Sequence, residues 1–496
     1  MRFSLRLASN VVLYSLFHVS TIVEAAFSNN ALSTCNDLQT RLGSKIVQLS
    51  SGAEYLAGAT NAWDLFNTVQ RPSCIIFPRN SSHVQTAMAG IFRDQVRYAV
   101  QAGSHSAMKG WNNVQDGVLI FFSHMKNISF DATTDTITLQ PGIHWGEALN
   151  TLEPLGVAPM GGRITDVGTG LLLGGGYSYL ASEHGFSVDA LKEADVVLVT
   201  GKLVTATATN KYSDLFRALK GGANRFGIVT RYVVSAIHTG TNQDKNWFGG
   251  IVMYPNSSVE AVVNATANYV RNTKDPKTGL LVVLANVVVD SVLTASHVVT
   301  MFYRGSTLPS SIFGEFLSIP STVQLLGPKS YIEVASSLGD GADRGILSLF
   351  GASARKGGPE QFLDAFRHWT NYTIAVQGSV NTSIMAFTPI LDTQIVASRA
   401  SGGNVINPPR GSYAAIQLET QLSPGVLEVP VDIERGRQLL FKQIPPSPGL
   451  PLYINECDAS QNVYKTYGDF EFLKRTYMKY DPTRFIIRFS EGPIGL

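Results

Sequence analysis

The sequence predicts an α+β fold in two parts, and three features of the 496-residue chain lead to that prediction. The first 240 residues mix short apolar strands with short amphipathic helices. A dense run of glycines, residues 161–176, falls within this part. Beyond about residue 240 the glycine density falls and longer strands alternate with longer helices, a pattern typical of an antiparallel sheet with helices packed on it.

In the first part of the chain, the predicted strands end in turns of small residues. Residues 74–77 form a short apolar strand, and Ser81 and Ser82 can cap the helix that follows. Residues 96–100 form a strand that runs into a loop of small residues, 101–106. Downstream we expect a strand at 136–139, a helix at 144–152, a hairpin of 196–199 with 203–206, a helix at 214–220 and a strand at 227–234.

In the second part of the chain, the predicted strands and helices are longer. We expect strands near 247–253, 279–288 and 293–303, and helices near 258–271 and 359–371. The Pro- and Ser-rich residues 444–451 are interpreted as a linker. The chain is completed by a helix in which Phe470, Leu473, Tyr477 and Tyr480 share a face and which Asp481-Pro482 ends.

The amino-acid composition argues against several classes of protein. The 39 Lys and Arg residues nearly balance the 37 Asp and Glu residues, so the net charge of +2 gives no sign of a nucleic-acid binder. A hydrophobic fraction of 44% predicts a packed globular protein rather than a disordered or fibrous one. Three cysteines form one disulfide at most, so the fold does not depend on a disulfide framework.

Residues 1–25 have the features of a secretory signal. Two arginines precede an apolar run, residues 7–23, and Val23-Glu24-Ala25 fits a cleavage site, so the mature chain would begin near Ala26. The alternative is a signal anchor that stays in the membrane, although polar residues interrupt the apolar run. No later segment approaches a membrane span, so we expect no membrane association after cleavage.

Two further features agree with a secreted, N-glycosylated protein. Six Asn-X-Ser/Thr triplets are present, at Asn80, Asn127, Asn256, Asn264, Asn371 and Asn381. In an oxidising compartment Cys35 and Cys74 could pair and tie the N-terminal segment to the first part of the chain. Cys457 would then be unpaired, and it could equally be a buried apolar residue.

The glycine-rich residues 161–176 are the most informative stretch. Glycine permits positive φ and a close approach of the backbone to a flat or anionic ligand, with N–H groups as donors. The same density of glycine also occurs in ordinary turns. No GxGxxG opens a helix here and no GKS/T follows, so nicotinamide cofactors and ATP are poorly supported.

Taken with residues 101–110, this stretch resembles the flavin-binding domain of vanillyl-alcohol-oxidase-type (PCMH-type) and berberine-bridge-enzyme-like oxidoreductases, in their fungal form. The family's motifs occur in order, at 103–106 (GSHS), 141–145 (PGIHW), 161–176, 185–189 (GFSVD), 214–230, 453–455 (YIN), 467–468 and 479–482. The resemblance implies an FAD-binding domain of two α+β subdomains over 26–240, an antiparallel-sheet substrate domain over 241–445, and a terminal berberine-bridge-like segment over 446–496 that returns to the FAD domain.

The resemblance also implies a covalent flavin. In this family the histidine of the small-residue loop, here His105, bonds to the 8α methyl of FAD. The cysteine that many relatives attach to the flavin has no counterpart in residues 163–168, so one link is expected. The other FAD contacts implied are Ala102, Gly103, Ser104, Ser106, Gly168, Thr169, Gly174, Gly175, Gly176, Ile228 and Asn455. Ile228 could instead be a plain core residue, and Asn455 a turn former.

The catalytic base is less clearly marked. Many relatives carry a tyrosine after the terminal Tyr-x-Asn, whereas this chain has Glu456. A carboxylate partly desolvated beside a flavin would have a pKa raised toward the working pH and could take the substrate's proton. The substrate domain offers alternatives that the sequence does not rank, namely Tyr303, Tyr331, Tyr413 and His368. The remaining histidines lack the spacing of metal ligands, and no metal site is expected.

The resemblance therefore implies a secreted FAD-dependent oxidase. Such an enzyme takes a hydride from a small organic substrate, here expected to be a specialised-metabolite intermediate, and passes the electrons to O2 to give hydrogen peroxide. Three alternatives use the same pocket: a carbohydrate oxidase, a dehydrogenase that uses another acceptor, and a redox-silent cyclase. Fold resemblance names no substrate, and the sequence leaves the oligomeric state open.

Overall fold

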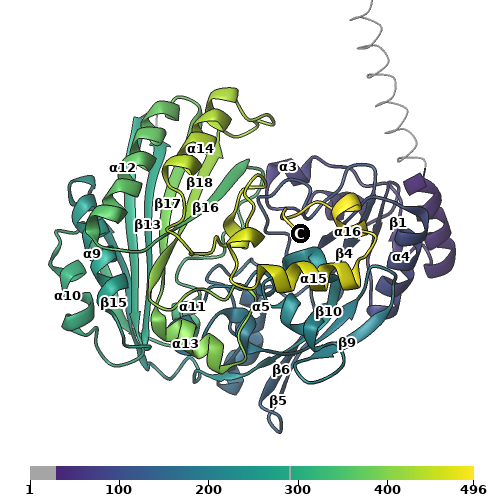
Figure 1. The fold of residues 1–496 in the computed structure, drawn as a ribbon, viewed down its shortest axis with the longest axis horizontal. Coiled ribbons are helices and arrows are strands. Elements are labelled where there is room, and N and C mark those ends of the chain that lie inside the picture. The colour runs from purple at the N-terminus through teal and green to yellow at the C-terminus, as the bar shows by residue number, and fades with distance from the viewer. Residues whose placement is uncertain (1–29, 290–291) are drawn as a thin grey trace, which may run out of the picture.

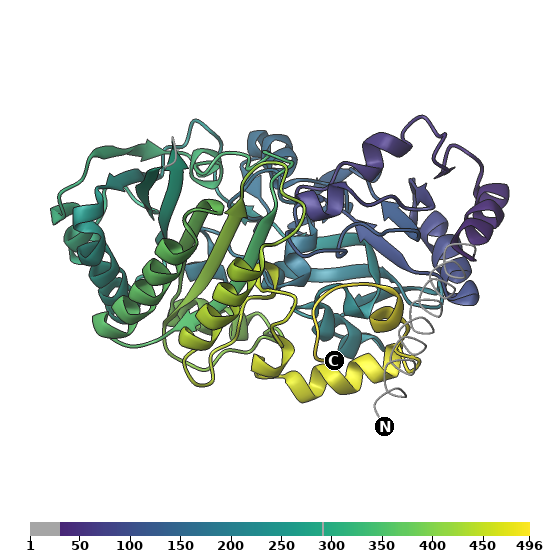
Figure 2. The same ribbon diagram turned by 90° about the horizontal axis from the view of Figure 1, so that it is seen from above.

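The chain has mixed helix and sheet throughout, which confirms the predicted α+β class (Figures 1 and 2). A computed structural model describes residues 30–289 and 292–496. The predicted signal segment, residues 1–25, lies outside the described residues. The strands form sheets of four, five and seven strands and one two-stranded ribbon.

The four-stranded sheet carries the small-residue loop. Its order is β1 (Val47–Gln48), β2 (Cys74–Ile76), β4 (Val118–Phe121), β3 (Tyr98–Gln101), with β2, β4 and β3 parallel. Helix α4 (Ser81–Asp94) packs Val84, Met88 and Ile91 into the core beside this sheet. The cap of α4 is Asn80, not Ser81 or Ser82, because the Asn80 side chain accepts from the N–H groups of Ser82 and His83.

A disulfide fastens the N-terminal segment to this sheet. Cys35, in a helical stretch at 30–42, is bonded to Cys74 at the start of β2, as the sequence had suggested. Cys457 is free and buried, and its Sγ–H donates to the carbonyl of Ile454. It is therefore a residue of the core that the terminal segment shares with the first part of the chain.

The five-stranded sheet lies beside the glycine-rich stretch. Its strands are antiparallel in the order β5 (Ile128–Asp131), β6 (Thr136–Leu139), β10 (Ile228–Ser235), β8 (Leu191–Val197), β9 (Leu203–Thr207). The flanking helices α5 (Trp145–Leu152) and α8 (Ser213–Leu219) lie where the sequence placed them. The backbone N–H of His144 donates to Glu147 at the start of α5, which fixes the entry of the chain into that helix.

The seven-stranded sheet is antiparallel, as expected for the second part. Its order is β15 (Val323–Lys329), β12 (Trp247–Tyr254), β14 (Val292–Tyr303), β13 (Thr278–Val289), β17 (Val380–Ile390), β18 (Tyr413–Leu422), β16 (Ser348–Arg355). Helices α9 (Val259–Asn272), α10 (Ser310–Ser318), α12 (Pro359–Val376) and α14 (Val431–Gln443) lie along one side of this sheet (Figure 1). The sequence analysis found three of these strands and missed the other four.

Successive side chains of β18 alternate between the two faces of this sheet. Ala414, Ile416 and Leu418 enter the core shared with the helices. Tyr413 and Ala415 enter the core shared with the first part of the chain. Successive strand residues point to opposite faces, so Glu419 lies on the face that Tyr413 and Ala415 share.

The C-terminal segment crosses back to the first part of the chain (Figure 1, yellow). It contains η5 (Ile454–Glu456), α15 (Phe470–Tyr480) and α16 (Phe485–Phe489). The hydroxyl of Tyr464 donates to the carbonyl of Gly222, and the guanidinium of Arg225 donates to the carbonyls of Ser490 and Pro493. The stretch interpreted as a linker, 444–451, is partly buried rather than free.

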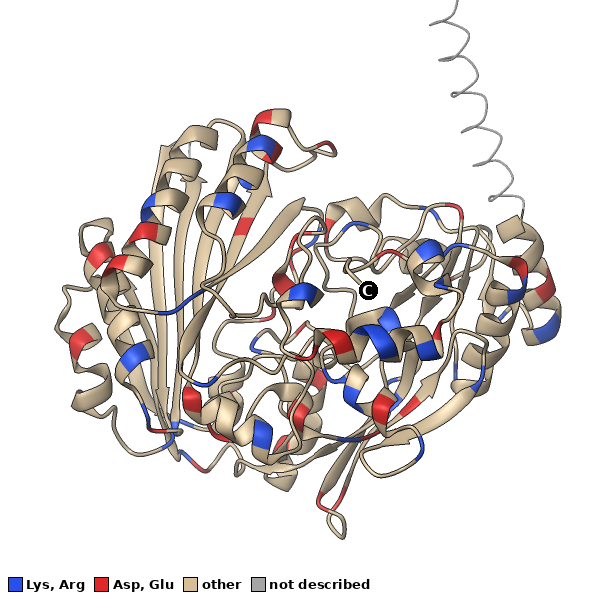
Figure 3. Ribbon diagram, viewed as in Figure 1, with Lys and Arg blue, Asp and Glu red and all other residues tan. Residues whose placement is uncertain are grey.

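Charged side chains of both signs are interspersed along the outer helices (Figure 3). Among the residues described, no helix has the length and apolarity needed to cross a membrane. The same residues contain no group of three or more His, Cys, Asp or Glu side chains that could hold a metal ion.

Replacing both Cys35 and Cys74 by Ser is expected to lower the free energy of unfolding by about 4 kcal/mol, because the bond closes a loop with a sequence separation of 39 residues. Urea unfolding of the double variant measures this loss. Thiol titration of the denatured, unreduced wild type supplies the control, with Cys457 as the single reactive thiol. Three reactive thiols before reduction would be incompatible with the assigned bond.

Candidate active site

Two glycines bring the small-residue loop against the glycine-rich stretch. A Cβ on Gly103 would lie 2.5 Å from the N and Cα of Gly168, and a Cβ on Gly168 would lie 2.6 Å from the Cα of Gly103. Real Cβ atoms do not approach backbone so closely, so only glycine fits at either position. The loop after β3 and the stretch before α6 (Gly170–Leu173) therefore share one backbone contact.

The backbone around this contact fits an anionic ligand. Within the described chain, the N–H groups of Gly103, Ser104 and His105 have no hydrogen-bond acceptor in the protein. Ser104 has a positive φ of 62°, a left-handed conformation that non-glycine residues rarely adopt. Consecutive unpaired N–H groups in such a turn form a nest that binds anions. The residues present therefore fit the diphosphate of FAD.

The second glycine cluster lies beside the terminal segment. Gly175 and Gly176 have φ of 109° and 80°, which other residues would adopt only with strain. A Cβ on Gly174 would collide with the amide of Asn455. That amide donates to the carbonyl of Leu171 and to the hydroxyl of Tyr453, so it braces the glycine turn in this structure.

His105 is held by neighbours from two parts of the chain. The indole of Trp63 stacks on its ring with centroids 4.4 Å apart and planes 18° apart. Nε2 of His105 lies 3.2 Å from the carbonyl oxygen of Gly341, in the segment before β16. Burial lowers the pKa of His105, which favours the neutral imidazole needed of a nucleophile.

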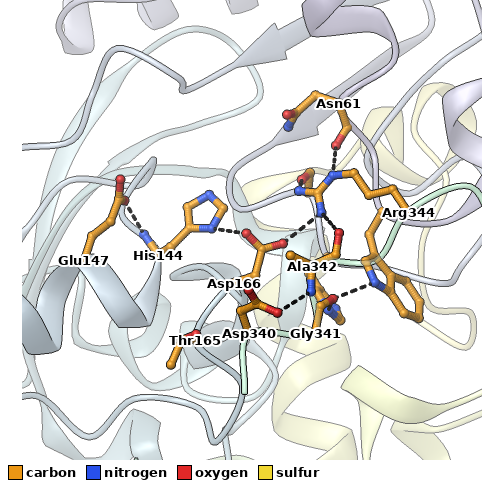
Figure 4. Close-up of polar contacts among 12 residues, drawn as sticks. Asn61, His144, Glu147, Thr165, Asp166, Asp340, Gly341, Ala342 and Arg344 are labelled. Carbon is orange, nitrogen blue, oxygen red and sulfur yellow. Dashed lines mark hydrogen bonds and ion pairs between the residues drawn. The ribbon is translucent and has the colours of Figure 1, made fainter. Parts of the chain in front are cut away.

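An ion network fastens the Gly341 segment over the loop (Figure 4). Asp166 accepts from Nδ1 of His144 at 3.0 Å and from Nη1 of Arg344 at 3.0 Å. Burial acts to raise the pKa of Asp166, but these two hydrogen bonds outweigh it and hold the pKa below its ordinary value. Arg344 also donates to the carbonyl of Asn61. One carboxylate thus joins the glycine-rich stretch to the substrate-domain segment.

Two buried or partly buried carboxyl groups from different parts of the chain have raised pKa values. Glu456 ends η5, and Glu419 lies on β18, where it is buried. Burial raises the pKa of each to about 7. For Glu456, Arg163 opposes the rise and Glu419 adds to it. Such a pair keeps one carboxyl ready to accept a proton near neutral pH.

Aromatic rings line the region around these carboxyls. Tyr453 stacks on Tyr177 with centroids 3.9 Å apart. The guanidinium of Arg163 lies 5.9 Å from the Tyr177 ring and donates to Thr388 on the seven-stranded sheet. Arg163, Tyr177 and Thr388 line one small pocket, whereas Tyr453 is buried against Tyr177.

The four alternative catalytic residues lie at different places relative to the seven-stranded sheet. Tyr303 and His368 lie on the helix side of the sheet, where they contact Asp275 and Asp364. Tyr331 is buried beside Ser178. Tyr413 shares the face of Glu419, and burial raises its pKa well above the ordinary value, so its hydroxyl stays protonated.

A cavity of about 430 Å³ between β14 and α12 also lies on the helix side, away from the glycine loops. Its lining includes His297 and Trp369, which are buried. It therefore lies on the opposite face of the seven-stranded sheet from Glu419.

The other residues predicted to contact FAD lie in different surroundings. Thr169 is buried, and its hydroxyl donates to the carbonyl of Pro141. Ile228 begins β10 and packs in the core beside the four-stranded sheet, which matches its alternative as a core residue. Ala102 and Ser106 flank the loop, and the N–H of Ser106 donates to the carbonyl of Ser104.

Sequence reasoning missed Glu419, Trp63 and Arg344. The signal for Glu419 was present: a carboxylate at an alternating position of a largely apolar strand, 413–422. Trp63 and Arg344 carry no such signal, because only the folded chain brings them to His105 and Asp166.

Known proteins resemble this chain over most of its length. Residues 72–207 match the FAD binding domain family. A FAD-linked oxidoreductase of Arthroderma benhamiae is 28% identical over 471 residues, which cover 91% of each chain. A FAD-dependent monooxygenase of Arthrobotrys oligospora is 28% identical over 476 residues, 92% of this chain and 88% of its own.

Solved structures share the fold. The xylooligosaccharide oxidase of Myceliophthora thermophila superposes with a TM-score of 0.72 at 20% identity, over 94% of this chain and 100% of its own. Phl p 4, a grass pollen allergen with glucose dehydrogenase activity, superposes with a TM-score of 0.71 at 18% identity, over 92% and 99%. At sequence identities of 20% and 18%, these superpositions show a shared fold only.

The stability of the protein is expected to fall between about pH 4.5 and pH 7 because of Glu419. Its pKa is raised from an ordinary 4.5 to about 7, so the protonated form stabilises the fold, fully at lower pH and progressively less as pH rises through 7. Glu419→Gln should remove about 3 kcal/mol of this pH dependence, as measured by urea unfolding across the range. Glu360→Gln, an exposed carboxyl, is the matched control. An unchanged slope in Glu419→Gln would refute the assignment.

Proposed function

This chain is an FAD-linked oxidoreductase with the PCMH-type FAD-oxidase fold, and from that premise we propose that it oxidises a small organic substrate with FAD bound covalently through His105. Bound FAD would supply a hydride acceptor and a route for the electrons to O2, with hydrogen peroxide as the product. The backbone N–H groups of residues 103–105 would hold its diphosphate, and His105 would supply the attachment.

The observation that carries the proposal is the backbone contact of the 103–105 loop, with its unpaired N–H groups, against Gly168 of the glycine-rich stretch. The proton acceptor is proposed to be Glu456 of the terminal segment, whose pKa is raised to about 7 by burial and by the charge of Glu419 on the seven-stranded sheet. As a hydride leaves carbon, the substrate's O–H or N–H must lose its proton. Glu456 accepts that proton, and Glu419 raises its basicity by like-charge repulsion.

The substrate is proposed to be a flat organic molecule, such as an aromatic specialised-metabolite intermediate. Arg163 and Tyr177 line one small pocket with Thr388 of the seven-stranded sheet, and an aromatic ring beside a guanidinium supports this class. A sugar would instead require several polar side chains for its hydroxyls. Carbohydrate oxidation is therefore the second candidate, and anaerobic bleaching of the flavin by oligosaccharides would favour it.

Secretion is proposed on separate grounds. The asparagines of four triplets, Asn80, Asn127, Asn256 and Asn371, are exposed, whereas Asn264 and Asn381 are half-buried. The disulfide between Cys35 and Cys74 also suits an oxidising compartment. We propose glycans at the four exposed positions.

Glu456→Gln should lower the rate of flavin reduction by about two to four orders of magnitude, since the substrate's proton loses its acceptor. Glu419→Gln should lower it less, because it removes only the repulsion. Anaerobic stopped-flow reduction measures both rates, and Glu360→Gln serves as an exposed control of the same chemistry. A change below threefold in Glu456→Gln would remove this residue from the mechanism.

Peroxide yield separates oxidase from monooxygenase chemistry. An oxidase releases one hydrogen peroxide for each substrate oxidised, whereas oxygen insertion consumes the O2 without an equal yield of peroxide. We expect equal amounts of peroxide and product in air. Slow reoxidation in air would instead indicate a dehydrogenase, and a flavin that no substrate reduces would indicate a redox-silent role.

A further inference from the structure

We propose that Trp63 and the carbonyl of Gly341 position the ring of His105 so that its Nδ1 forms the bond to FAD. The proposal rests on the covalent attachment in the proposed function and assigns the residues that direct it. Trp63 and Gly341 touch the attachment residue itself, so they are positioning groups rather than acid or base.

The first observation is that Trp63 is tied to the loop on which His105 lies. Its backbone N–H donates to the carbonyl of Ser104 at 3.1 Å, next to His105 in the chain. The same carbonyl accepts from the amide of Asn112 at 2.6 Å and from the N–H of Ser106. With its backbone fixed in this way, the indole covers one face of the imidazole at 4.4 Å.

The second observation identifies the nitrogen. A carbonyl oxygen only accepts hydrogen bonds, and the Gly341 oxygen lies 3.2 Å from Nε2 of His105 and 3.0 Å from Nε1 of Trp63. The tautomer with its proton on Nε2 makes this hydrogen bond, and in that neutral ring the lone pair belongs to Nδ1. One oxygen thus sets both the tautomer and the rotation of the imidazole.

The third observation is that the Gly341 carbonyl is itself held in place. Gly341 has φ of 61°, and a Cβ there would lie 2.7 Å from Cγ2 of Ile164. The N–H of Asp166 donates to the carbonyl of Asp340 at 3.1 Å. Arg344 donates to Asp166, to the carbonyl of Asn61 and, at 3.4 Å, to the hydroxyl of Ser104 (Figure 4).

The attachment step balances with O2 as the oxidant. A bond forms between Nδ1 and the 8α carbon, and one C–H bond of that methyl breaks. The C–H proton and the Nε2 proton leave, and the two electrons from the C–H bond reduce the flavin. O2 then takes up these two electrons and two protons and becomes hydrogen peroxide.

Positive charge develops on the imidazole as Nδ1 attacks. The Gly341 carbonyl stabilises it through the Nε2–H hydrogen bond, and the face of the Trp63 ring stabilises it through its quadrupole. Both contacts exist before the bond forms, and they strengthen as the positive charge develops. Loss of Trp63 should therefore slow bond formation without an equal loss of FAD binding.

The test compares wild type, Trp63→Phe and Trp63→Leu as purified and after incubation with FAD in air. Acid precipitation separates covalent from released FAD, and the absorbance of the pellet and supernatant gives the covalent fraction. Trp63→Phe keeps a stacked ring but loses the indole N–H, so we expect a fall of about twofold to fivefold in the rate of attachment. Trp63→Leu loses both the ring and the N–H. We therefore expect the rate of attachment to fall at least about tenfold, while the total bound FAD stays within twofold of wild type.

Wild-type attachment rates in both variants would overturn this proposal and leave the bond to His105 standing. Wild-type protein whose FAD is entirely released by acid would overturn the covalent attachment in the proposed function, and this proposal with it. Trp63→Phe keeps an aromatic ring at this position, so it provides the test even if Trp63→Leu does not fold. Thermal unfolding of each variant checks the fold.

Discussion

The contact between the backbones of Gly103 and Gly168 is the constraint on which the site depends. Neither position tolerates a Cβ, and the contact joins a loop from the four-stranded sheet to the stretch beside the five-stranded sheet. It therefore sets where the unpaired N–H groups of the loop point and where His105 emerges. The glycines are needed here for close approach, not only for turning the chain.

Two connections complete the site by closing the second half of the chain over the first. Arg344 joins the segment before β16 to Asp166, and the terminal segment brings Glu456 to the face of β18 that carries Glu419. The buried charges are compensated differently at the two places. Asp166 is kept ionised by hydrogen bonds from His144 and Arg344, whereas burial raises the pKa of Glu419 and of Glu456 to about 7.

The sequence predicted local elements better than long-range neighbours. Strands and helices such as 136–139 and 359–371 follow from hydrophobic periodicity, and the small-residue motifs predicted the FAD domain. Strands β15 to β18 were missed, because strands paired across a large sheet carry little signal in local periodicity. Trp63 and Arg344 reach the site only through tertiary packing, so no spacing along the chain marks them.

The central claim is that the two glycine segments form a flavin cleft with His105 at its edge. Mass spectrometry of the proteolytic peptide that contains His105, from acid-precipitated wild-type protein, tests it most directly. The account predicts a yellow precipitate and a His105 peptide that carries one FAD on that residue. An unmodified His105 peptide, with the flavin on another residue or in no fraction, would contradict it.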